Sequence, residues 1–90
     1  MIYKTNRVRL WESIMGIAKI GPGKRGGNFR LALSDSDIDA RKLFHKWSKE
    51  AGCIMRVDSM GNIFARRNGK IKDASPILSG SHLDTQTIRR

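Results

Sequence analysis

Pro76-Ile77-Leu78-Ser79-Gly80-Ser81-His82-Leu83-Asp84-Thr85-Gln86 is the stretch of this chain that decides the fold. Its first part, residues 76–81, is a short apolar run after a polar loop, which is typical of a strand inside a sheet. Polar side chains follow directly within residues 80–86. In α/β proteins the active groups gather at the carboxyl ends of strands. The stretch therefore predicts an α/β fold with a functional segment at the end of a strand.

His82 and Asp84 are the candidate site residues of this segment. A neutral imidazole can bind zinc at about 2.0–2.1 Å. A nearby carboxylate can accept a hydrogen bond from the other ring nitrogen, which fixes the tautomer of the ligand. The spacing alone is a weak signal, because zinc needs three or four donors. Taken by itself, a histidine in this pattern is more often a structural or surface residue.

A hairpin is predicted before this stretch, over residues 53–67. Side chains alternate from Cys53 to Asp58, Ser59-Met60-Gly61-Asn62 is a turn signal, and the strand pattern resumes after it. A polar loop then leads to the strand at residues 76–81.

A helix is predicted over residues 35–51. Ser34 followed by Asp37 is a capping-box pattern, and Gly52 is suited to a left-handed C-terminal cap. The expected apolar face consists of Ala40, Leu43, Phe44, Trp47 and Ala51. His45 lies off this face, so we interpret it as a solvated surface histidine.

A first helix is predicted over residues 7–19, with Asn6 as its N-cap and a broad apolar face. Residues 21–33 form a Gly-rich loop. This loop matches neither common phosphate-binding glycine pattern, so we interpret it as a flexible connector. The element order is therefore helix, helix, strand, strand, strand. An inner third strand needs neighbours on both sides, so the sheet is expected to be incomplete.

Composition narrows the class of protein. The 90 residues carry a net charge of +10, from 18 basic and 8 acidic residues, and 39% are hydrophobic. The basic residues are dispersed and the aromatic ones occupy core-like positions, which argues against a nucleic-acid surface. No run is long and apolar enough to predict a membrane span, and the first residues lack the apolar core of a signal peptide. One cysteine, Cys53, favours the reducing cytoplasm.

Five stretches of the chain carry a resemblance to a known family of enzymes. They are Arg9-Leu10-Trp11, Gly26-Gly27-Asn28-Phe29-Arg30-Leu31-Ala32-Leu33-Ser34, Glu50-Ala51-Gly52-Cys53, Val57-Asp58-Ser59-Met60-Gly61-Asn62-Ile63-Phe64-Ala65-Arg66-Arg67 and Ser79-Gly80-Ser81-His82-Leu83-Asp84-Thr85-Gln86. In this order the chain resembles the zinc-dependent amidohydrolases of the N-carbamoyl-L-amino-acid hydrolase, allantoate amidohydrolase and β-ureidopropionase group, within the metallopeptidase-like superfamily. The hairpin and the metal motif together are specific, whereas the helix matches alone are not.

The resemblance implies that residues 1–90 are one truncated N-terminal segment of a zinc-peptidase-like catalytic domain. It implies a hydrolase acting on linear amide C–N bonds of N-carbamoyl amino acids, allantoate or ureido compounds, as a homodimer when full-length. It implies a pair of divalent metals, Zn²⁺ or else Mn²⁺ or Co²⁺, and a glutamate as general base. Two roles carry over to this sequence: His82 as a metal ligand, and Asp84 as the residue that orients its imidazole.

The sequence departs from the family after Gln86. The family continues with Pro and then Gly-Gly-x-Phe-Asp-Gly, whose aspartate bridges two metals, whereas this chain continues with Thr87-Ile88-Arg89-Arg90. One codon string for that ending, read one nucleotide later, encodes Pro-Leu-Gly-Gly-Lys. We therefore expect a frameshift, real or from sequencing, and a truncated chain that is inactive alone and binds zinc weakly.

Two alternatives stay open from the sequence. The chain is also compatible with a small basic module that binds nucleic acid or a protein partner, whose binding would depend steeply on salt. It is compatible too with part of an enzyme that a second chain completes.

Overall fold

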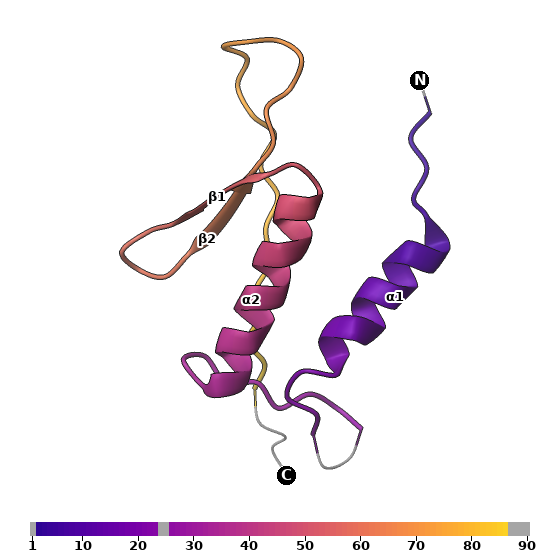
Figure 1. The fold of residues 1–90 in the computed structure, drawn as a ribbon, viewed down its shortest axis with the longest axis vertical. Helices are drawn as coiled ribbons and strands as arrows, with labels where there is room; N and C mark the ends of the chain where they lie inside the picture. Colours follow the sequence, from indigo (N-terminus) through magenta and orange to yellow (C-terminus); the bar gives the residue numbers. More distant parts are fainter. Residues whose placement is uncertain (1, 24–25, 87–90) are drawn as a thin grey trace. The chain divides into compact units, whose positions relative to one another are not determined.

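The structure is a computed structural model that describes residues 2–23 and 26–86. Its elements are α1 (Arg7–Ala18), α2 (Asp35–Glu50), β1 (Ile54–Val57) and β2 (Ile63–Arg66) (Figure 1). Contacts divide the chain into two compact units, Met1–Ala40 with Leu83–Arg90, and Arg41–His82. Each unit is described by itself below. The two helices and the two-stranded sheet make up a partial α/β domain, which confirms the predicted fold class.

Helix α1 begins as the sequence predicts. The Asn6 side chain accepts a hydrogen bond from the Arg9 amide at 3.0 Å, which satisfies one of the amides that a helix start leaves unpaired. The helix ends at Ala18, one residue before the predicted end, and the Lys19 amide donates to the Gly16 carbonyl. Its apolar side chains are largely exposed in the described chain, with 62% of Trp11 accessible to solvent.

The described residues of the Gly-rich loop after α1 form hydrogen bonds with one another. Pro22 and Asn28 form an antiparallel bridge, and the Phe29 amide donates to the Gly21 carbonyl at 2.7 Å. Gly21 has a φ of 69°, and a Cβ atom there would lie 2.6 Å from the Phe29 carbonyl oxygen. Only glycine fits this turn without displacing the backbone. These bonds join the two described ends of the loop, and the interpretation of residues 21–33 as a flexible connector stays a prediction.

The N-terminus of α2 has the predicted capping box. Ser34 Oγ accepts from the Asp37 amide at 3.3 Å, and the Asp37 carboxylate accepts from the Leu33 amide at 3.0 Å. Asp37 is only 5% exposed, so its charge is held by hydrogen bonds near the positive end of the helix dipole. The reciprocal pattern differs slightly from the expected one, because the carboxylate reaches Leu33 rather than the amide of the cap residue itself.

The C-terminus of α2 closes with the predicted glycine cap. Gly52 has a φ of 87°, its amide donates to the Lys49 carbonyl, and the Cys53 amide donates to the Ser48 carbonyl. These two bonds form a Schellman motif. On the expected apolar face, Ala40 is fully buried, three larger side chains are half-buried and Ala51 is exposed. His45 is exposed, as predicted.

The predicted hairpin is present as β1 and β2, which pair antiparallel in the register Ile54↔Arg66 to Val57↔Ile63. The cross-strand pair Arg56 and Phe64 places the guanidinium 4.6 Å from the ring centroid. Within the same unit, Arg41 Nη2 on α2 donates to the Gly61 carbonyl at 2.5 Å, so the helix holds the hairpin turn.

Asp58 organises that turn. Its carboxylate accepts from the Met60 amide at 3.0 Å, the Asn62 amide at 2.8 Å and Asn62 Nδ2 at 2.9 Å. The hydrogen bond from the Asn62 side chain, followed by that from its amide, lowers the pKa of Asp58 below its ordinary value of 3.8. Gly61 completes the turn with a φ of 88°.

The predicted third strand at residues 76–81 is not formed. The residues from 74 to 86 have no regular secondary structure, and Ile77 and Leu78 are 100% and 85% exposed. A strand needs a hydrogen-bonded neighbour, and within the described chain β1 and β2 pair only with each other. The prediction of an inner strand at residues 76–81 is therefore wrong for the described chain, because the apolar pattern gives no information on whether adjoining strands are present.

Candidate functional site

The predicted metal motif, residues 80–86, is an extended segment without regular structure. His82 is exposed and is the last residue of the unit Arg41–His82. Asp84 is half-buried and belongs to the other unit, through the returning segment that starts at Leu83. The contacts therefore assign the two candidate residues to different units.

Hydrogen bonds of the Thr85 backbone and side chain fix the segment around Asp84. The Arg30 amide donates to Thr85 Oγ1 at 2.8 Å, and the Thr85 amide donates to the Arg30 carbonyl at 2.6 Å. Thr85 Oγ1 in turn donates to the Asn28 carbonyl at 3.2 Å. Arg30 and Thr85 lie 55 positions apart in the sequence, and both the amide and the carbonyl of Arg30 bond to Thr85.

The Arg30 side chain adds a second attachment. Its Nε donates to the Leu83 carbonyl at 2.8 Å, and its Nη1 donates to the carbonyls of Ile17 and Ile20 at 3.0 and 2.7 Å. The residue is only 6% exposed. One buried guanidinium therefore links the end of α1 to the residue just before Asp84.

The electrostatics of a helix end explain why the Arg30 guanidinium is stable next to α1. The last carbonyls of a helix lack intrahelical partners and carry the negative end of the helix dipole. Arg30 and Asn28 meet these carbonyls, since Asn28 Nδ2 donates to the Ala18 carbonyl at 2.8 Å. The planar guanidinium offers several donors in a fixed arrangement, which suits a set of converging carbonyl oxygens.

Sequence reasoning missed the roles of Arg30 and Thr85. The available signal was a single charge within the mostly apolar stretch Phe29-Arg30-Leu31-Ala32-Leu33. Charged residues are rarely buried unless they are paired, so this position favoured a specific structural role. The acceptors could not be predicted, because they are backbone carbonyls that the fold alone brings close.

Metal-binding side chains do not gather in the described part of the chain, where no group of three or more His, Cys, Asp or Glu residues could hold an ion. Cys53 is a half-buried free thiol. The imidazole of His82 is a donor of the type that zinc prefers, so the chemistry of this residue fits the predicted metal. The set of donors among the described residues is nevertheless incomplete for a zinc site.

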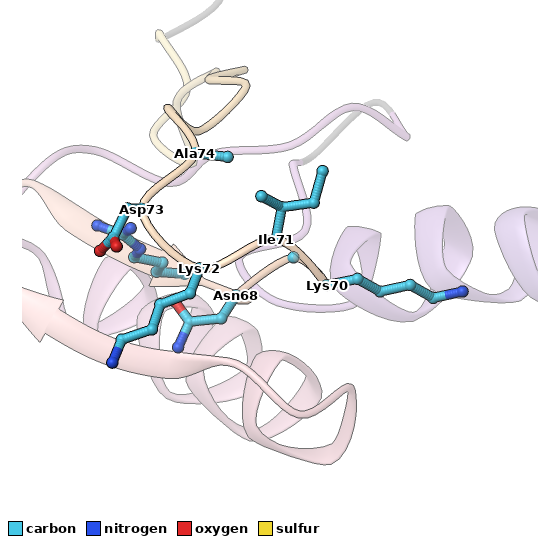
Figure 2. Close-up of a pocket in the computed structure, with 8 residues that line it drawn as sticks. Asn68, Lys70, Ile71, Lys72, Asp73 and Ala74 are labelled. Carbon is cyan, nitrogen blue, oxygen red and sulfur yellow. The ribbon is translucent and has the colours of Figure 1, made fainter.

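A separate hollow lies beside the loop that follows β2 (Figure 2). It is open to solvent, and its lining consists of Arg66, Asn68, Gly69, Lys70, Ile71, Lys72, Asp73 and Ala74. The side chains of Lys70 and Lys72 extend in opposite directions in Figure 2, so they do not converge on one point. This lining offers no arrangement for catalysis or metal binding.

Known amidohydrolases match nearly all of the chain. An N-carbamoyl-L-amino-acid amidohydrolase of Rhizobium meliloti is 53% identical over 83 residues, which is 92% of this chain and 20% of that protein. An allantoate amidohydrolase of Escherichia coli is 32% identical over 79 residues, 88% of this chain and 19% of that protein. The chain is a homologue of these amidohydrolases.

Solved structures are similar to the chain as well. A hydantoinase/carbamoylase-family amidase of Burkholderia multivorans superposes with a TM-score of 0.88 at 52% identity. The match covers 92% of the present chain and 20% of the amidase chain. An amidohydrolase/peptidase of Burkholderia cenocepacia gives a TM-score of 0.90 at 49% identity. This match covers 94% of the present chain and 21% of the other chain. The predicted resemblance is therefore confirmed. No family model matches the sequence.

The chain spans about a fifth of the length of the curated relatives that it matches. Its likeness to them thus concerns one part of an enzyme. None of its described helices has the length and apolar character needed to cross a bilayer.

Proposed function

We propose that this amidohydrolase homologue contributes a metal-ligand segment to an enzyme that hydrolyses linear amide C–N bonds in carbamoyl or ureido compounds. The relatives supporting this are named N-carbamoyl-L-amino-acid amidohydrolase and allantoate amidohydrolase. The single observation that carries the proposal is the match over 92% of the chain to the first of these, at 53% identity. The exposure of His82 and the hydrogen bonds that hold the residues flanking Asp84 are compatible with it.

In this proposal His82 is a metal ligand and Asp84 holds its imidazole in the tautomer that leaves one nitrogen for the metal. We propose Zn²⁺, which suits an imidazole donor, with Mn²⁺ or Co²⁺ as alternatives. When bound, such an ion polarises the scissile carbonyl and lowers the pKa of a bound water. The remaining donors and the general base lie outside the described residues, so the chain by itself is expected to be inactive and to bind zinc weakly.

The same resemblance supports proposals on the substrate, the location and the assembly of the enzyme. We propose small carbamoyl or ureido substrates, a cytoplasmic location and a homodimeric full-length assembly. The dispersed basic residues of this chain give no support to a nucleic-acid partner.

A chimera tests the proposal directly. Residues 1–86 of this chain would replace the matching stretch of the Rhizobium meliloti relative, and hydrolysis of an N-carbamoyl-L-amino acid would be measured. We expect kcat/KM within about tenfold of the parent, and a loss of at least about a thousandfold in His82→Ala, because a metal ligand is removed.

The matched control is His45→Ala, which removes the other histidine of the chain from an exposed helix position. This variant should keep the activity of the chimera. Equal activity of the His82→Ala and His45→Ala chimeras would rule out the proposed role of His82.

A further inference from the structure

We propose that Arg30 is a positioning residue: its buried guanidinium and its backbone hold residues Leu83–Thr85 against the end of α1 and thereby set the position of Asp84. The inference rests on the proposed function for the role of Asp84, but the hydrogen bonds of Arg30 to residues 83 and 85 do not depend on that function. No role for Arg30 follows from the metal motif or from the names of the relatives.

The hydrogen bonds of Arg30 enclose Asp84 from both sides. Nε holds the carbonyl of the preceding residue, Leu83, at 2.8 Å. The backbone of Arg30 exchanges bonds with Thr85, the following residue, at 2.8 and 2.6 Å. With the two peptide groups that flank Asp84 fixed, the Asp84 backbone has little freedom to rotate.

The Nη1 atom of the same guanidinium bonds to the backbone around the end of α1. Nη1 donates to the carbonyl of Ile17 in the last turn of α1 and to that of Ile20, two residues after the helix ends. Arg30 is 6% exposed, so water cannot readily replace these bonds. A site residue held in this way keeps its geometry, which is what metal chemistry requires of the groups around a ligand.

Lysine could replace this arrangement only in part. Its ammonium group is a compact donor at the end of a flexible stem, whereas guanidinium presents fixed donors to acceptors in several directions. We therefore expect a graded series, in which Arg30→Lys retains some positioning and Arg30→Gln retains little.

The first experiment follows amide hydrogen exchange by NMR in the 90-residue chain. We expect a protected Thr85 amide and an observable, slowly exchanging Arg30 Nε–H. Arg30→Gln should speed exchange at Thr85 at least tenfold, with a smaller increase in Arg30→Lys, while the Leu10 amide, bonded to the Asn6 carbonyl, is unchanged.

The matched control is Arg41→Gln, which removes an arginine that also donates to a backbone carbonyl, that of Gly61 in the other unit. It should leave Thr85 exchange unchanged. An unprotected Thr85 amide, or a rapidly exchanging Arg30 Nε–H in the unsubstituted chain, overturns the attachment without reference to any variant, so misfolding of Arg30→Gln cannot obscure the result.

The second experiment measures positioning in the chimera described above. Arg30→Gln should lower kcat for an N-carbamoyl-L-amino acid at least tenfold, change KM less than threefold, and alter the visible spectrum of the Co²⁺-loaded protein. Arg30→Lys should restore part of kcat. A merely structural residue would leave kcat and the cobalt spectrum of the folded fraction unchanged, and this outcome overturns the proposal.

The His82→Ala chimera separates the two ideas. If it keeps activity and cobalt binding, the proposed function fails, whereas protection at Thr85 still measures the attachment by Arg30.

Discussion

At the scale of single residues, hydrogen bonds from side chains to the backbone determine much of this structure. Ser34 and Asn6 cap the helices, as their sequence positions predict, because capping depends on a few neighbouring residues. Arg30 could not be predicted in this way, since its acceptors at Ile17 and Leu83 come from distant parts of the chain. Local chemistry is therefore readable from the sequence, and long-range pairing is not.

Asp58 gives a prediction of pH dependence at this scale. Its pKa in the folded hairpin is below the ordinary value of 3.8, chiefly because Asn62 Nδ2 and the Asn62 amide donate to the carboxylate. The charged form is therefore favoured by folding, so the stabilisation is complete above the unfolded pKa and is lost as the pH falls through the folded pKa.

An NMR titration of the Asn62 amide checks this expectation. Its midpoint should lie below pH 3.8, and Asp58→Asn should remove the transition. Asp73, on the exposed polar loop, offers a matched control, because Asp73→Asn should leave the Asn62 titration in place. A midpoint above 3.8 would contradict the role assigned to the turn.

At the scale of elements, the helices and the hairpin agree with the sequence, and residues 76–81 do not. Helix and hairpin signals depend on period, caps and turn residues within about fifteen positions, all of which the chain contains. The expected strand depends on adjoining strands, and Ile77 is fully exposed without them. The segment that carries His82 thus leaves the hairpin as an extended chain rather than from the end of a strand.

Gly52 provides a test at the scale of the helix end. Its φ of 87° is unfavourable for a residue with a Cβ atom, so Gly52→Ala should lower the free energy of unfolding by roughly 1–2 kcal/mol. Urea denaturation followed by circular dichroism measures this change. Gly69→Ala is the control, because an added Cβ there meets nothing within 4 Å and its φ is not positive. Equal effects of both substitutions would argue against the cap.

At the scale of the whole molecule, the described residues bury few apolar side chains. Within its described residues Ala40 is the fully buried apolar side chain, while Trp11, Ile77 and Leu78 remain mostly exposed. Relatives that match nearly all of this chain are about five times as long. The resemblance to amidohydrolases could be predicted from five ordered stretches of sequence, whereas the proposed metal site could not be assembled, because the described residues contain no group of three or more metal-binding side chains.

The metal content of the purified chimera tests the central claim, that His82 belongs to the metal site of an amidohydrolase, most directly. Inductively coupled plasma mass spectrometry would compare the unsubstituted chimera with His82→Ala and with His45→Ala. The account predicts that His82→Ala loses at least about half of the bound metal, since a ligand is removed, and that His45→Ala retains all of it. Unchanged metal content in His82→Ala, with the protein folded, would contradict the account.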